Sequence, residues 1–184
     1  MEYETQKTEA IILEEKEMGE SDKFFTLYTK DFGKIEVLGK SIRKIRAKLR
    51  GGLQILNYIS LEFVQGKNFF IATDAILKNE FLNLKSEPKK FRQAIYICHL
   101  SNELVKGKEK DEKIWNLLLE TLNDLAIRQL LLRYFEWNLI SLLGFKPELH
   151  FCINCQEKIK TGKFYFSAKD GGILCEKCFK NLEK

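Results

Sequence analysis

The sequence has no apolar run that approaches the roughly 18 residues needed to cross a membrane, although 45% of its 184 residues are hydrophobic. Its first residues, MEYETQKTEA, are polar and acidic, so they do not form the basic and then apolar pattern of a secretory signal peptide. We therefore expect a chain that buries a core and remains in the cytoplasm, without a membrane partner.

The sequence also lacks a recognisable catalytic constellation. It has only two histidines, His99 and His150, and its acidic residues form no paired-carboxylate motif. No internal repeat or low-complexity segment is evident. Acid–base catalysis needs titratable groups held in matched positions, so the sequence predicts a protein that is not an enzyme.

Charge is present but unevenly distributed. The net charge is +5, yet residues 1–22 hold two lysines against eight acids, whereas residues 33–54 hold seven cations against one acid. These seven cations are Lys34, Lys40, Arg43, Lys44, Arg46, Lys48 and Arg50. A polyanion lying across them would relieve their mutual repulsion and release its own counterions. The alternative is a solvated loop that keeps an edge strand soluble.

Five runs of β-branched, aromatic and apolar residues precede residue 80, separated by turn signals. They span residues 8–14, 24–29, 34–38, 53–64 and 69–77. Five short strands in so short a stretch predict a small closed barrel, typical of an OB-fold, with an SH3-like barrel as the alternative.

Helical spacing replaces this pattern after Pro88, which suits the first turn of a helix. We expect helices over 91–105, 114–125 and 127–143, the last two as separate helices or as one broken helix. Cys98 and His99 fall in the first. Adjacent helical positions point about 100° apart, so we expect a buried thiol beside an exposed imidazole and not a chelating pair.

The remaining four cysteines, Cys152, Cys155, Cys175 and Cys178, form two Cys-x-x-Cys pairs separated by 19 residues. This spacing is typical of a four-thiolate zinc ribbon. Four thiolates leave no open position for water, so we expect one structural zinc ion. The alternatives are two disulfides, which are rare in the cytosol, and a redox dithiol, which usually uses only one Cys-x-x-Cys pair. His150 is a further possible ligand that the fourth thiolate makes unnecessary.

These patterns together predict an α+β protein with three domains. A five-stranded OB-fold barrel is expected over residues 1–84, a helical domain over 85–148, and a four-cysteine zinc ribbon over 149–184.

Three stretches resemble the RecO family of bacterial recombination mediators. Residues 8–44 read TEAIILEEKEMGESDKFFTLYTKDFGKIEVLGKSIRK, residues 131–149 read LLRYFEWNLISLLGFKPEL, and GGILCEKC ends at Cys178. The resemblance implies an OB-fold, a helical domain and a zinc module. It also implies a DNA repair and recombination mediator that binds single- and double-stranded DNA and anneals complementary strands. With RecR, such a protein helps the recombinase RecA to load onto DNA coated with single-strand-binding protein, at the bacterial nucleoid.

The resemblance gives the basic residues a role as phosphate contacts, which carry affinity without sequence preference. Aromatic side chains in the strands could add base stacking, although most strand aromatics belong to a core. The candidates are Tyr58, Phe63, Phe69 and Phe70. The family's helical domain also receives the acidic, apolar tail of single-strand-binding protein. Arg128 and Arg133 are candidates for this contact, with pairing to Glu136 as the alternative.

The chain departs from the family pattern after the zinc module. Many members continue with further helices, whereas only residues 179–184 follow Cys178 here. We therefore expect a smaller helical domain and fewer partner surfaces. The other functional reading is a zinc-ribbon adaptor that binds protein and has no annealing activity of its own.

Overall fold

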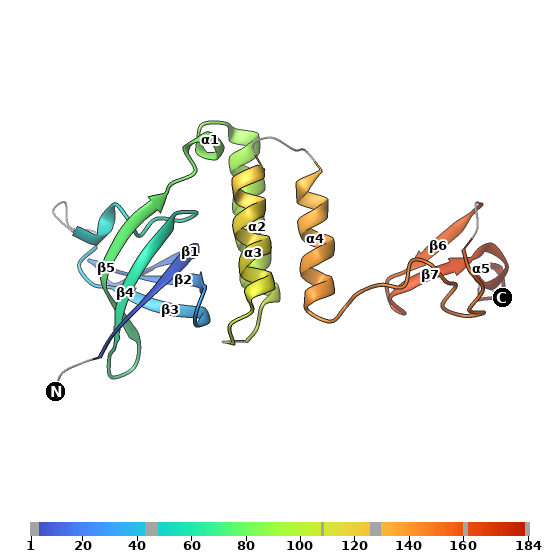
Figure 1. The fold of residues 1–184 in the computed structure, drawn as a ribbon, viewed down its shortest axis with the longest axis horizontal. Coiled ribbons are helices and arrows are strands. Elements are labelled where there is room, and N and C mark those ends of the chain that lie inside the picture. The colour runs from blue at the N-terminus through green and yellow to red at the C-terminus, as the bar shows by residue number, and fades with distance from the viewer. Residues whose placement is uncertain (1–3, 43–47, 108, 126–129, 160–161, 183–184) are drawn as a thin grey trace. The chain divides into compact units, whose positions relative to one another are not determined.

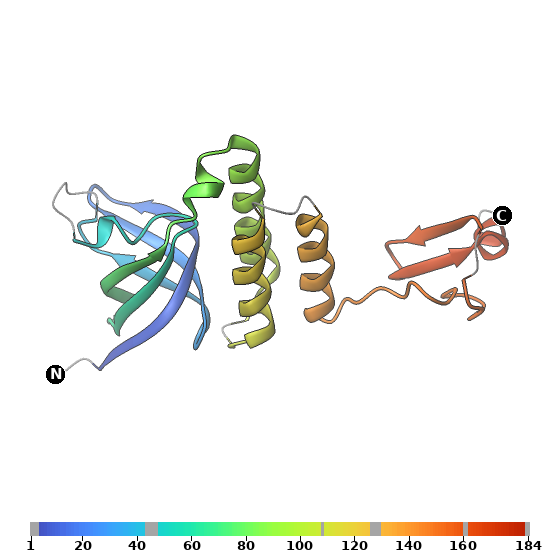
Figure 2. The ribbon, with the colours of Figure 1, turned by 45° about the horizontal axis from the view of Figure 1, so that its top comes forward.

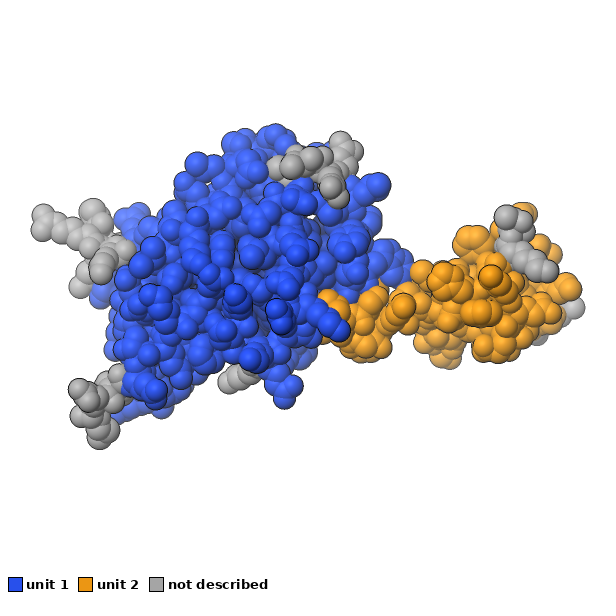
Figure 3. Space-filling model, viewed as in Figure 1, with its two compact units in different colours: residues 1–139 blue, residues 140–184 orange. Residues whose placement is uncertain are grey.

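The structure is a computed structural model that describes residues 4–42, 48–107, 109–125, 130–159 and 162–182. The chain forms two compact units, residues 1–139 and 140–184 (Figure 3). The predicted boundaries of three domains, at 84/85 and 148/149, stay a prediction. In the described residues, no helix is both long and apolar enough to span a bilayer.

Five strands close into a barrel in the first unit (Figures 1 and 2). They are β1 (Thr5–Met18), β2 (Asp22–Thr29), β3 (Gly33–Gly39), β4 (Tyr58–Gln65) and β5 (Phe70–Asn79). The ring order is β1-β2-β3-β5-β4, and β4 pairs back onto β1. Only the β3–β5 pair is parallel among these strands. This arrangement confirms the predicted OB-fold and not the SH3-like alternative.

Strand alternation builds the barrel core. On β2 and β3, Phe25, Leu27, Ile35 and Val37 point inward, because successive side chains of a strand face opposite sides. The same cluster contains Ala10, Ile12, Ile59, Leu61 and Phe63 from β1 and β4, and Ala72 and Ala75 from β5. The register of β1 with β2 shifts between Ile12 and Glu14, which is typical of a bulge that bends a strand. β1 pairs with β2 on one side and with β4 on the other.

The predicted strand over residues 53–64 is wrong in its first part, since β4 begins only at Tyr58. Residues 53–57 form turns instead, and Leu56 has a φ of 73°. Leu53 and Leu56 are buried nonetheless. The apolar residues that resemble a strand in the sequence are therefore buried from a folded loop, and Leu53 joins the barrel core.

Three helices follow the barrel within the first unit: α1 (Leu82–Lys85), α2 (Pro88–Leu104) and α3 (Glu112–Asp124). Pro88 occupies the first turn of α2 as expected, and Asp111 caps α3 by accepting backbone N–H bonds from Lys113 and Ile114. The hydroxyl of Tyr28 donates to the carbonyl of Asp111 at 3.3 Å. The short helix α1 has no counterpart among the predicted elements.

Helix α4 (Leu131–Leu142) corresponds to the last predicted helix and is separate from α3. It crosses from the first unit into the second. Within α2, Cys98 is fully buried and His99 is exposed. Burial raises the pKa of the Cys98 thiol to about 12, so this cysteine acts as a small apolar core residue.

The second unit contains a hairpin, formed by β6 (Phe164–Ser167) and β7 (Gly172–Cys175), followed by α5 (Glu176–Leu182). Gly171 supplies the positive φ, 67°, at the turn. The rings of Tyr165 and Phe179 stack with centroids 3.7 Å apart and join the hairpin to α5. Few apolar side chains are buried in this unit, mainly Cys152, Ile173, Leu174 and Cys178, so its own apolar core is small.

Candidate nucleic-acid interface and metal centre

The basic segment, residues 40–50, is fixed to the barrel near both ends. Ile42 is buried in the barrel core, and Leu49 packs against that core. The backbone N–H of Ser41 donates to Oδ1 of Asp22 at 2.7 Å. Lys40 and Arg50, at the two ends, are exposed. The apolar residues thus anchor the segment while its terminal cations face solvent.

The basic segment contains four further predicted cations. Arg43, Lys44 and Arg46 lie outside the described residues, as does the side chain of Lys48, whose backbone begins the short 3-10 helix η1 (Lys48–Arg50). Their role in binding an anion stays a prediction.

A hollow of about 540 Å³ adjoins the C-terminal end of the basic segment. Arg50, Lys23 and Lys85 contribute its cations, and Phe25, Leu53 and Phe91 its apolar lining. Two acids, Glu15 and Glu17, also line it. The ammonium of Lys23 pairs with Glu15 at 2.9 Å. The hollow is therefore of mixed charge, and its two extra cations come from β2 and α1.

Lys23 and Lys85 were missed in the sequence because they lie far from the basic segment along the chain. Only the closure of the barrel and the position of α1 bring them beside Arg50. A lysine soon after the last strand is a weak signal, since solvated lysines are common there.

Lys34 is placed differently from the basic segment. It is half-buried, and its ammonium donates to the carbonyl of Asn102 on α2 at 2.7 Å. Burial lowers the pKa of Lys34, and the nearby ammonium of Lys106 lowers it further. One donor of Lys34 thus holds a helix against the barrel, and two remain for other partners.

The four aromatic candidates have different surroundings. Phe63 is fully buried, and Phe70 packs partly against the barrel core. The hydroxyl of Tyr58 donates to Oε2 of Glu9 at 2.9 Å. Phe69, in contrast, is 43% exposed. Of these four side chains, Phe69 offers the freest ring face.

Arg133 projects from the first turn of α4, and its side chain is 72% exposed. Its guanidinium donates to Oε2 of Glu136 at 2.7 Å, which is the pairing considered as the alternative in the sequence. Arg128 lies outside the described residues. The contact of these arginines with a protein tail stays a prediction.

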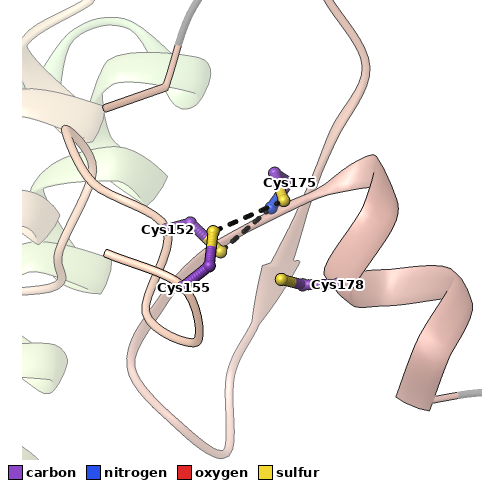
Figure 4. Close-up of side chains that lie close together, drawn as sticks. All are labelled: Cys152, Cys155, Cys175 and Cys178. Carbon is purple, nitrogen blue, oxygen red and sulfur yellow. Dashed lines mark hydrogen bonds between the residues drawn. The ribbon is translucent and has the colours of Figure 1, made fainter. Parts of the chain in front are cut away.

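The two Cys-x-x-Cys pairs meet at one point in the second unit (Figure 4). Cys152 and Cys155 lie on a turn closed by the Gln156 N–H to Cys152 carbonyl bond of 2.8 Å. Cys175 ends β7, and Cys178 lies in α5. All four Sγ atoms are within 4.8 Å of one another, so the sequence correctly predicted which cysteines converge.

The sulfur geometry fits a tetrahedral metal ion. The Sγ atoms of Cys155 and Cys175 are 3.8 Å apart. A tetrahedron with metal–sulfur bonds of about 2.3 Å has sulfur–sulfur edges of about 3.8 Å. A disulfide would bring the two sulfurs to about 2.05 Å. These four cysteines could therefore hold one ion.

Two thiols of the cluster have pKa values that are shifted in opposite directions. Burial opposes ionisation of Cys152, but backbone N–H groups of Cys155, Cys175 and Asn154 lower its pKa to about 6. For Cys155, a backbone bond from Glu157 lowers the pKa, yet desolvation and the neighbouring thiols raise it to about 12. One thiolate is stabilised and a second is opposed. A bound cation would allow all four to ionise together.

Two family models match the chain. The model described as Recombination protein O N terminal matches residues 1–81, which contain the barrel. The model described as Recombination protein O C terminal matches residues 86–184, which contain the helices and the cysteine cluster.

Curated relatives agree with these matches. The DNA repair protein RecO of Dehalococcoides mccartyi is 35% identical over 175 residues, which cover 94% of this chain and 69% of the relative. The protein of the same name from a Thermoanaerobacter species is 31% identical over 181 residues, covering 94% and 70%. That of Alkaliphilus metalliredigens is 28% identical over 176 residues, covering 94% and 71%.

Proposed function

The chain belongs to the recombination protein O (RecO) family of DNA repair proteins, and from this we propose that it is a recombination mediator and not an enzyme. It binds single- and double-stranded DNA and anneals complementary strands in the bacterial cytoplasm, at the nucleoid. It also helps RecA to load onto DNA coated with single-strand-binding protein. The observation that carries the proposal is a basic segment anchored near both ends to an OB-fold barrel.

Annealing requires two polyanions to approach while their bases remain free to pair. Cations that contact phosphate lower the repulsion and carry no sequence preference. We assign this role to Lys40, Arg43, Lys44, Arg46, Lys48 and Arg50, with Lys34 beside them. Lys34 can use only the donors that its bond to the Asn102 carbonyl leaves free. An anchored segment loses less conformational freedom on binding than a loose loop would.

The metal in the cysteine cluster is zinc on this proposal. Four thiolates prefer a soft or borderline ion, and a closed tetrahedral set is the usual structural zinc site. Zinc stabilises the second unit, which buries few apolar side chains around Cys152, Leu174 and Cys178. Its role is to hold the hairpin and α5 together.

The proposed protein partners are RecR, the C-terminal tail of single-strand-binding protein and, indirectly, RecA. For the tail we propose Arg128 and Arg133. The guanidinium of Arg133 lies on α4 near the exposed Tyr134, and the exposed Leu130 directly precedes this helix, so a cation and apolar side chains are available together. A surface ion pair contributes little free energy. A carboxylate of the tail could therefore replace Glu136 at Arg133.

Strand annealing tests the proposal. Two complementary labelled strands, one coated with single-strand-binding protein, are mixed with the wild type or with the Arg43→Glu/Arg46→Glu/Lys48→Glu variant over a salt series. We expect the wild type to anneal and the variant to fail. For single-stranded DNA without single-strand-binding protein, log affinity falls with log salt. The magnitude of this slope should be smaller by roughly 2 in the variant, about 0.7 for each of the three phosphates that it no longer neutralises.

A matched control carries the same change in charge elsewhere. Lys110, Lys113 and Lys169 are exposed and lie outside the basic segment. Their triple substitution by Glu should leave most of the annealing activity and most of the salt slope intact. If the wild type binds no DNA even at low salt, the mediator function is wrong and a protein-binding zinc adaptor replaces it.

A further inference from the structure

An exposed aromatic ring stands at the turn between β4 and β5. Phe69 is 43% exposed, and its ring meets that of Phe24 edge-on, with centroids 4.8 Å apart and planes at 72°. Phe24 lies on β2 and pairs in register with Leu38 of β3. The turn thus holds one ring against the outer side of β2 and β3 and leaves much of that ring open to solvent.

The backbone of this turn is tightly held. The N–H of Gly66 donates to the carbonyl of Phe69 at 2.9 Å. A Cβ at position 66 would lie 2.7 Å from this carbonyl oxygen, so only glycine fits here without a shift. This bond therefore holds the backbone of Phe69, and the edge-on contact with Phe24 orients the ring that a planar ligand would meet.

Lysines flank the ring on two sides. Phe69 lines a hollow of about 450 Å³ together with Lys40 and Lys67, both exposed. It also lines a second hollow, of about 490 Å³, together with Lys34 and Lys106. Within the described part of the chain, Lys40 and Lys67 make no ion pair with a carboxylate. Phe69 therefore borders two hollows, each of which contains two lysines.

One acid, Glu36, also faces the second hollow. Burial makes the largest contribution to lowering the pKa of Lys34, and the nearby ammonium of Lys106 lowers it further. The two ammonium groups therefore repel each other. An anion between them would relieve this repulsion.

We propose that Phe69 is a base-stacking residue for single-stranded DNA, with Lys40 and Lys67 contacting the phosphates next to the stacked base. This inference rests on the proposed function and names the group that distinguishes a single strand from a duplex at this site. A base in a duplex is stacked on both faces, so it cannot stack on a protein ring unless it leaves the helix. The lysines, in contrast, can contact the phosphates of either form.

Single-stranded DNA fits this surface better than an apolar protein partner does. A partner that covered Phe69 with apolar side chains would also remove Lys40 and Lys67 from water without giving them counter-charges. A nucleotide supplies a planar apolar face and an anion close to each other, and stacking on aromatic rings tolerates any base. The exposed ring of Phe69 and the ammonium groups of Lys40 and Lys67 beside it match this combination of a planar face and an anion.

The test compares oligothymidine, an abasic strand of the same length and a duplex, each titrated with the full-length protein at one salt concentration. For Phe69→Ala we expect roughly tenfold weaker binding of oligothymidine. Binding of the abasic strand and of the duplex should remain unchanged, because the phosphate contacts remain. Phe69→Tyr keeps a ring of the same shape and should restore wild-type affinity.

A control and a check of folding accompany these variants. Ile76 is also exposed on the barrel, 54% by area, and Ile76→Ala should leave all three affinities unchanged. The unfolding midpoint of each variant shows whether the barrel is intact. If folded Phe69→Ala binds oligothymidine as the wild type does, the stacking role is wrong while the proposed function stands. If the wild type binds no DNA at all, both are wrong.

Discussion

The ammonium of Lys85 donates a 2.6 Å hydrogen bond to the side-chain oxygen of Asn57. The amide nitrogen of the same asparagine donates to the carbonyls of Gly51 and Gly52, at 3.2 and 2.9 Å. Asn57 is only 1% exposed. One buried side chain therefore joins α1 to the loop that leaves the basic segment, and it fixes the end where Arg50 lies.

Replacing Asn57 with Ala should destabilise the first unit by about 3 kcal/mol, because the substitution leaves a half-buried ammonium and two carbonyls without their partner. Chemical denaturation measures the free energy of unfolding. Asn116 is exposed on α3, and Asn116→Ala should change that free energy by less than about 0.5 kcal/mol. Equal effects of the two substitutions would contradict the anchoring role.

The two adjacent glycines of this loop should respond differently to alanine. A Cβ at Gly52 would lie 2.3 Å from the carbonyl oxygen of Ala75, whereas a Cβ at Gly51 would have no atom within 4 Å. We expect Gly52→Ala to cost about 1–3 kcal/mol, because β5 must shift to admit the methyl group. Gly51→Ala should be nearly neutral. Urea denaturation of both variants checks this, and a neutral Gly52→Ala would show that the loop moves freely.

Alkaline pH should destabilise the protein through Tyr28. Burial, followed by the carboxylate of Asp111, raises the pKa of Tyr28 to about 12 from 10.0. Above pH 10 the unfolded state releases this proton while the folded state retains it, so stability falls as the pH rises from 10 to 12. The full loss is about 2–3 kcal/mol.

The Tyr28→Phe variant cannot ionise at this position, so its stability should fall less steeply over that interval. At neutral pH it should lose about 1 kcal/mol with the bond to the Asp111 carbonyl. Free energies of unfolding measured at several pH values test both statements. Tyr134→Phe, at an exposed position, controls for the loss of a hydroxyl. Parallel pH curves for Tyr28→Phe and the wild type would refute the assignment.

Loss of one thiolate should release the metal and unfold only the second unit. Cys155 is exposed, so Cys155→Ser removes a ligand with little loss of packing. We expect the bound metal to fall from one ion per chain towards none. Proteolysis should then cleave within residues 149–182 while the barrel stays resistant.

Cys98→Ala provides the control for this prediction, because it removes a buried thiol that belongs to α2 and not to the cluster. It should keep one ion per chain, although the core loses some packing. Retention of a full complement of metal by Cys155→Ser would mean that another residue completes the site.

The strands, the helices and the cysteine cluster could be predicted because each rests on local signals. Alternating apolar residues, Pro88 at a helix start and the spacing of Cys152 and Cys155 depend on near neighbours in the chain. The turn at Leu56 could not be predicted, because a positive φ at a leucine is unfavourable by itself. Hydrogen bonds between the backbones of Leu56 and Ile12, and of Ile12 and Asn57, stabilise it from β1.

The candidate interface was predictable only in part. A run of cations marks the basic segment, but the sequence does not show that Lys34 is bound to the carbonyl of Asn102, since this contact depends on how α2 packs. Likewise, Phe63 and Phe69 look alike in a strand-rich stretch. The turn at Gly66 exposes Phe69 to solvent, whereas the alternation of side chains along β4 places Phe63 in the core.

The parallel pairing of β3 with β5 has a consequence for the local stability of the barrel. The parallel register between β3 and β5 joins only Val37 with Phe70 and Leu38 with Ile71, whereas the antiparallel ladders are longer. A short ladder returns little hydrogen-bond free energy for the loop that it closes. The ring should therefore open along this line before the rest of the barrel unfolds. In native-state hydrogen exchange, the amides of this pair should exchange through such local opening, at a lower free energy than those between β1 and β2.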